Sequence, residues 1–139
     1  MAAWRRDVSA GAAYFALTFA VGALVGPVRE VMLKPLVGET GALLVEAPLM
    51  IAAMALIAAR VVARFGVSST RPARIIMGGV ALALLLVAEM ALTYLLRHIS
   101  PAVWVAHFWS REGMISATLY ALFAMMPVAL LVVREGRPT

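Results

Sequence analysis

Four long apolar blocks constrain the fold of this chain more than any other feature. They cover residues 8–28, 41–59, 73–96 and 113–133. Each block holds roughly 19 to 24 residues, close to the ~20 that a helix needs to cross a hydrocarbon core about 30 Å thick. Because backbone polar groups in lipid must pair within their own segment, each block is expected to be helical. The sequence therefore predicts an all-α membrane protein, a single four-transmembrane-helix bundle over residues 1–139.

The composition supports this class and excludes several others. The chain is 64% hydrophobic and 14% charged, against roughly 45–50% and 25% in soluble domains. Its net charge of +5 indicates membrane topology rather than nucleic-acid binding, because the chain has no long basic run or soluble module. The absence of cysteine excludes disulfides, thiolate metal sites and cysteine nucleophiles. We expect no cofactor, no metal and no nucleic-acid partner.

The distribution of Lys and Arg predicts the orientation. The segments on the side of the two termini carry eight basic residues: Arg5, Arg6, Arg60, Arg64, Arg71, Arg74, Arg134 and Arg137. The segments on the opposite side carry four: Arg29, Lys34, Arg97 and Arg111. By the positive-inside rule both termini are cytoplasmic. The first block is too long for a signal peptide and is expected to be an uncleaved span.

Capping and helix-breaking residues mark the expected ends of the helices. Polar caps precede the third block at residues 68–70, the stretch after it at Ser100 and the fourth block at Ser110. Gly26 and Pro27 are expected to end the first helix, and Gly136 and Pro138 the last. The aromatic stretch 101–109 between the third and fourth blocks is typical of a short interfacial helix.

Carboxylates inside the apolar blocks form the candidate site. At 1.5 Å per residue, Glu46 and Glu89 both lie roughly 8–10 Å below the outer interface. A charge at mid-span costs about 2.5–3.5 kcal/mol, so it should face the bundle and pair, or be neutral. Arg29 is the expected partner of Glu46, and Glu89 either shares Arg29, pairs with Arg111 or stays protonated. Glu112 lies on the same outer side, whereas the inner half is expected to be purely apolar.

This polar set has two interpretations. The first is a network of Arg29, Glu46, Glu89, Arg111 and Glu112 that fixes helix order and register. The second is a site that binds a cation or relays protons across the membrane. The scarcity of polar residues leading to the inner side favours the first interpretation.

The two histidines and the small residues form two further patterns. His98 and His107 lie outside the apolar core on one side, which argues against haem and favours ordinary interfacial hydrogen bonds over a zinc site with Glu112. No nucleophile elbow, phosphate loop or metalloprotease motif is present. Small residues at close spacing predict helix interfaces. They are Gly22, Gly26, Ala12, Ala16 and Ala20 in the first block and Gly78, Gly79 and Ala83 in the third. An interface within the chain is favoured over one with another chain.

Short motifs along the chain carry a family resemblance: Gly26-Pro27-x-Arg29, Pro35-Leu36-x-Gly38, Glu46-x-Pro48, Met77-Gly78, Ala88-Glu89 and Ala124-Met125-Met126-Pro127. The chain resembles a family of small bacterial four-span integral membrane proteins that has no assigned activity. The resemblance covers nearly the whole chain and departs from the family pattern at Pro27. It implies the bacterial inner (plasma) membrane, the four-span topology and the set of Arg29, Glu46 and Glu89, but no activity.

Three functional classes follow. The favoured class is a non-catalytic membrane protein, a subunit or assembly partner of a membrane complex or a homo-oligomer. The second is a small transporter or channel for protons or cations that uses Glu46 and Glu89. The third and weakest is a membrane enzyme that acts on a lipid or quinone near His107, Arg111 and Glu112.

Overall fold

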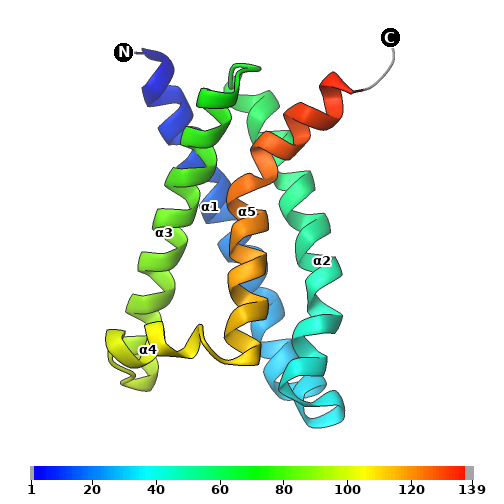
Figure 1. Cartoon of the computed structure of the whole chain (residues 1–139), viewed down its shortest axis with the longest axis vertical. Helices are drawn as coiled ribbons and strands as arrows, with labels where there is room; N and C mark the ends of the chain where they lie inside the picture. Colours follow the sequence, from blue (N-terminus) through cyan, green and yellow to red (C-terminus); the bar gives the residue numbers. More distant parts are fainter. Residues whose placement is uncertain (1, 137–139) are drawn as a thin grey trace.

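The computed structural model describes residues 2–136 and is helical almost throughout (Figure 1). Its elements in chain order are α1 (Ala2–Val28), the π-helical turn η1 (Arg29–Leu33), α2 (Lys34–Phe65), α3 (Arg71–Arg97), α4 (Pro101–His107) and α5 (Arg111–Glu135). The all-helical class is confirmed. Three helical stretches are long and apolar enough to cross a membrane, namely Ala2–Phe65, Arg71–Arg97 and Arg111–Glu135. Arg137, which was counted for the orientation, and Pro138, which was expected to help end the last helix, lie outside the described residues.

The long helices form a bundle with alternating directions. In Figure 1, α1 and α3 run down the view, whereas α2 and α5 run up it. α1 packs against α2 and α3, and α5 packs against the same two helices. Both termini and the connection between α2 and α3 lie at one end, named here the terminal end. The connection between α1 and α2 lies with α4 at the other, named the hairpin end.

The first helix ends later than the sequence predicts. Pro27 lies inside α1, and the helical backbone continues through the π-helical turn that begins at Arg29. Gly38, with φ 79° and ψ 175°, is the non-helical residue within the stretch assigned to α2. This conformation is open mainly to glycine. The chain therefore turns back at Gly38, and the prediction of an end at Gly26 and Pro27 is wrong because a proline inside a membrane helix can be accommodated by a local π-type adjustment.

The later helix starts agree with the sequence. The hydroxyl groups of Thr70, Ser100 and Ser110 accept hydrogen bonds from backbone N–H groups in the first turns of α3, α4 and α5. These bonds satisfy donors that a helix start leaves without an intrahelical partner. Gly136 follows α5 directly. The aromatic stretch expected to be a short helix is α4.

Buried side chains from all four long helices meet in one core. The largest fully buried side chains are Tyr14, Phe123, Met77 and Pro127. Many large apolar side chains face outward instead, among them Leu24, Leu36 and Leu96, each at least 75% exposed. An outward surface of this kind suits lipid, which covers apolar side chains that water would not.

Two glycines allow close contact between helices. A Cβ added to Gly78 of α3 would lie 1.9 Å from the backbone oxygen of Ala124 in α5. One added to Gly11 of α1 would lie 2.6 Å from the backbone oxygen of Met77. By contrast, a Cβ at Gly22 or Gly26 would meet no atom of the described residues within 4 Å. The prediction of a close helix contact within the chain at Gly22 and Gly26 is therefore wrong, whereas the predicted contact at Gly78 is formed.

Tyr14 compensates for the proline in α5. Pro127 has no N–H, so the carbonyl oxygen of Phe123, four residues earlier, lacks its usual helical donor. The hydroxyl of Tyr14 donates to that oxygen at 2.8 Å. The rings of Tyr14 and Phe123 also stack, with centroids 4.4 Å apart. This pairing joins α1 to α5 across the middle of the bundle.

Tyr14→Phe is expected to lower the free energy of unfolding by about 1 kcal/mol, because the buried Phe123 oxygen loses its donor. Unfolding of the detergent-solubilised protein, followed by circular dichroism, measures the change. In a Pro127→Ala background the restored N–H supplies the missing donor, so the same substitution should cost clearly less. An equal cost in both backgrounds would contradict the compensation.

Candidate functional site

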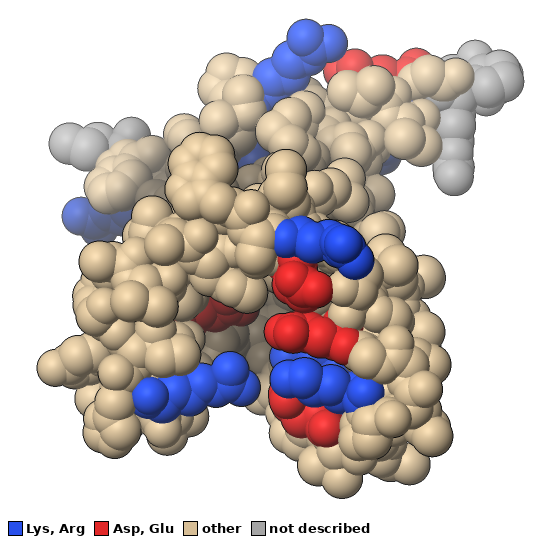
Figure 2. All heavy atoms as spheres, turned by 60° about the horizontal axis from the view of Figure 1, so that its bottom comes forward, with Lys and Arg blue, Asp and Glu red and all other residues tan. Residues whose placement is uncertain are grey.

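Charged side chains concentrate at the hairpin end. Figure 2 turns this end toward the reader and shows acidic and basic groups on the sides of a hollow in its surface. The segments at this end include η1, the first turns of α2, the last turns of α3 and the start of α5. Each predicted site residue belongs to one of these segments.

Arg29 and Glu46 form the central ion pair. Nη1 of Arg29 lies 2.7 Å from Oε2 of Glu46, which is 8% exposed. The reversal at Gly38 brings η1 back against α2 and places the two groups opposite each other. The contact expected from the sequence is present. A bond of this length between ionised groups is stronger than a neutral hydrogen bond.

The pair extends along the π-helical turn. Nε of Arg29 lies 3.7 Å from Oε1 of Glu30, and Nζ of Lys34 lies 3.2 Å from Oε2 of the same carboxylate. Cationic and anionic groups thus alternate from Lys34 through Glu30 and Arg29 to Glu46. Alternation of this kind lets a charge near lipid be neutralised by its neighbours.

Glu89 has a different partner from those expected. The hydroxyl of Tyr120 in α5 donates to Oε2 of Glu89 in α3. No arginine lies within ion-pair distance of Glu89 among the described residues. The two expected ion pairs, with Arg29 and with Arg111, are therefore wrong, because Tyr120 faces Glu89 across the contact between α3 and α5. The third alternative, a protonated Glu89, stays a prediction.

Aromatic rings connect α4 to this contact. Phe108 meets the ring of Tyr120 edge to face at 5.9 Å, and Trp104 meets Phe108 in the same manner at 5.0 Å. Such edge-to-face pairs add about 0.5–1.5 kcal/mol beyond the area they bury. Trp104 of α4 and Phe108, which follows α4, thus pack toward the side chain that binds Glu89.

Glu112 joins α5 to α2, whereas Arg111 stands apart. The hydroxyl of Thr40 donates to Oε1 of Glu112 at 2.6 Å. Arg111 is exposed and makes no ion pair with the described residues. Its predicted contact within the network is therefore not formed. No three His, Asp or Glu side chains in the described part come together to hold a metal ion.

The terminal end also contains buried polar groups, which the sequence interpretation missed. Arg74 is 3% exposed and donates to the backbone oxygens of Ser68, at 3.2 Å, and Pro127, at 3.0 Å. Asp7 is 4% exposed and receives a bond from Arg6, which also donates to Ser68. The expectation of a purely apolar inner half is therefore wrong. From the sequence, Arg74 bears only on the orientation, and no contact is predicted for it.

Comparison with models of protein families, with curated proteins and with solved structures gives no significant match. The chemistry of the site therefore has to be judged from its geometry. The carboxylates of Glu46, Glu89 and Glu112 each contact a side chain from another segment of the chain. Such contacts hold neighbouring segments in fixed register.

Proposed function

We propose that the chain is a four-span protein of the bacterial inner membrane with both termini in the cytoplasm. The reversal at Gly38 divides the longest apolar stretch into two antiparallel parts that pack together. Each part is long enough to cross a bilayer by itself. The excess of Lys and Arg at the terminal end supports the cytoplasmic orientation of that end.

Within that topology, we propose a non-catalytic role as a subunit or assembly partner of a membrane complex. The observation that carries this proposal is the pairing of Glu46, Glu89 and Glu112 with side chains of other segments. A carboxylate that already accepts from a fixed partner has less capacity to bind a passing ion. The three contacts link α2 to η1, α3 to α5 and α5 to α2, which suits a rigid bundle.

The surface of α1 supports a protein partner. In the direction of a Cβ, Gly22 and Gly26 face open space, and no atom of another described helix lies within 4 Å of that position. Glycines at this spacing allow a second helix to approach closely in a membrane. In this proposal the second helix belongs to another protein or to another copy of the chain.

Gly22→Leu is expected to abolish co-purification of the partner while leaving the stability of the isolated protein within about 1 kcal/mol, because the added side chain meets only lipid in the free chain. Gentle extraction from native membranes followed by native mass spectrometry measures the association. Gly79→Leu is the matched control, since a Cβ at Gly79 also meets nothing within 4 Å. Loss of the partner in both variants, or in neither, contradicts the assignment to α1.

A second candidate function is a small transporter or channel for protons or cations that uses Glu46 and Glu89. The charged hollow at the hairpin end favours it (Figure 2), since intramembrane carboxylates recur in proton and ion pathways. Ion flux into liposomes that contain the purified protein is its direct test.

A further inference from the structure

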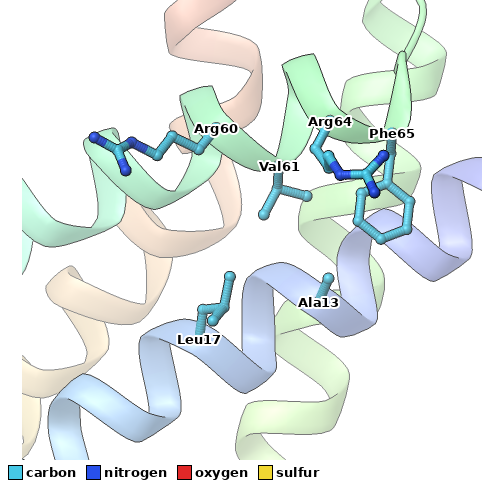
Figure 3. A pocket seen from close by; sticks show the side chains of 6 residues that line it. All are labelled: Ala13, Leu17, Arg60, Val61, Arg64 and Phe65. Atoms are coloured by element: carbon cyan, nitrogen blue, oxygen red, sulfur yellow. The ribbon is translucent and has the colours of Figure 1, made fainter.

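A groove opens between α1 and α2 at the terminal end, away from the charged hollow. Its volume is about 350 Å³, and it is lined by Ala13 and Leu17 of α1 and by Arg60, Val61, Arg64 and Phe65 of α2. Figure 3 shows Val61 of α2 above Leu17 and Ala13 of α1, with the small side chain of Ala13 leaving room beside it. The inner wall of this groove is therefore apolar.

Two arginines stand on the α2 side of this apolar wall. Arg60 and Arg64 are four residues apart and thus neighbours on one face of the helix. In Figure 3 their side chains extend to either side of Val61. Both arginines are exposed, and neither forms an ion pair with the described residues. The groove thus combines an apolar inner wall with two cationic groups that form no ion pair with the described residues.

The position of the groove along α2 matches the level of lipid headgroups. Phe65 is the last residue of α2, so Arg64 lies in its final turn and Arg60 about one turn deeper, roughly 6 Å along the axis. Long basic side chains near the end of a membrane helix extend toward the interface. In a bilayer whose surface lies at this end of α2, the guanidinium groups can reach the level of the phosphates and Leu17 lies deeper, at the level of the acyl chains.

We propose that this groove binds one anionic phospholipid. One acyl chain lies along Ala13, Leu17 and Val61, and the phosphate is held by Arg64. Arg60, whose side chain extends to the other side of Val61, adds attraction to the negative charge. The guanidinium fork matches phosphate oxygens and offers two parallel hydrogen bonds. Basic pockets between membrane helices on the cytoplasmic side are known to hold anionic headgroups. The site does not depend on the assembly role, and only the choice of leaflet rests on the proposed topology.

Charge complementarity favours an anionic lipid over another helix. A helix in this groove would have to present acidic side chains at the level of Arg60 and Arg64 and an apolar face against Leu17 and Val61. A zwitterionic lipid brings its own cation to the same place and gains less from two arginines. The anionic lipid supplies both the apolar chain and the negative charge without such a cost.

Native mass spectrometry of the full chain, released from detergent with phosphatidylglycerol or phosphatidylcholine added, tests the proposal. We expect one tightly held phosphatidylglycerol per chain and much weaker retention of phosphatidylcholine. Because each basic residue near an anionic lipid contributes about a fivefold effect, Arg60→Gln/Arg64→Gln should weaken phosphatidylglycerol binding by about 30-fold. Arg71→Gln is the matched control, as Arg71 is exposed at the same end but does not line the groove.

A second variant tests the apolar part of the site and does not alter its charge. Leu17→Trp fills the groove and should reduce lipid retention with both arginines in place. Glycerophosphoglycerol, the headgroup without acyl chains, should compete only weakly with phosphatidylglycerol for the groove, because the acyl chain contributes to binding. Equal retention of the two lipids, an equal loss in Arg71→Gln, or full competition by the free headgroup would overturn the proposal.

Discussion

Gly78→Ala is expected to lower the free energy of unfolding by about 3 kcal/mol, because a single methyl group would have to enter space held by the backbone of α5. The added Cβ would lie 1.9 Å from the oxygen of Ala124 and 3.0 Å from its carbonyl carbon. Neither atom can rotate away as a side chain does. The helices must separate, and the contacts of the neighbouring core residues Met77 and Phe123 loosen with them.

The adjacent residue supplies the control. Gly79 follows Gly78 in α3, and a Cβ there meets nothing within 4 Å. Gly79→Ala should therefore leave stability unchanged or raise it by up to about 1 kcal/mol, since alanine is the better helix former. The loss of stability in Gly11→Ala should lie between those in Gly78→Ala and Gly79→Ala, because its Cβ would lie 2.6 Å from the backbone oxygen of Met77. Denaturation in mixed detergent micelles measures all three, and equal stability of Gly78→Ala and Gly79→Ala would contradict the close contact of α3 with α5.

Features that depend on nearby residues could be predicted from the sequence. The long helices could be predicted from the lengths of the apolar blocks. The starts of three helices could be predicted from Thr70, Ser100 and Ser110, because their side chains accept hydrogen bonds from backbone N–H groups only three residues away. Arg29 and Glu46 are 17 residues apart and are joined by one turn of the chain. A hairpin of that size brings its ends together with little dependence on the rest of the fold.

Features that depend on how helices face each other could not be predicted. Tyr120 and Glu89 are 31 residues apart on separate helices, and Tyr14 is 109 residues from Phe123. The rotation of each helix about its axis decides such contacts, and apolar blocks surrounded by lipid reveal little of it. For the same reason the small-residue pattern in the first block pointed to Gly22 and Gly26, whereas Gly11 makes the close contact.

The position of the first turn shows a different limit. A proline next to charged residues is a common sign that a helix ends, and for this reason the sequence predicts an end at Pro27. The helix instead continues, and its π-helical turn carries Arg29 and Glu30. The two charged residues therefore stand on helical backbone. This fixes the direction in which Arg29 reaches Glu46.

Glu46→Gln is expected to destabilise the protein by roughly 3 kcal/mol, the lower end of the range for breaking a buried ion pair, because Arg29 keeps some exposure and a second contact with Glu30. The amide keeps the shape of the side chain but cannot balance the charge of Arg29. Arg29→Met should cost at least as much, since it leaves the carboxylate of Glu46 buried without a cation. Thermal unfolding in detergent and the yield of folded protein from membranes measure both effects.

The double variant Arg29→Met/Glu46→Met separates ion pairing from packing. Replacing both charges with apolar side chains of similar volume removes the unpaired group, so it should recover most of the lost stability. Recovery, together with unchanged ion flux in liposomes, is the result expected of a pair that holds α2 against η1. A Glu46→Gln protein with unchanged yield and melting temperature but lost flux would contradict that role and favour transport.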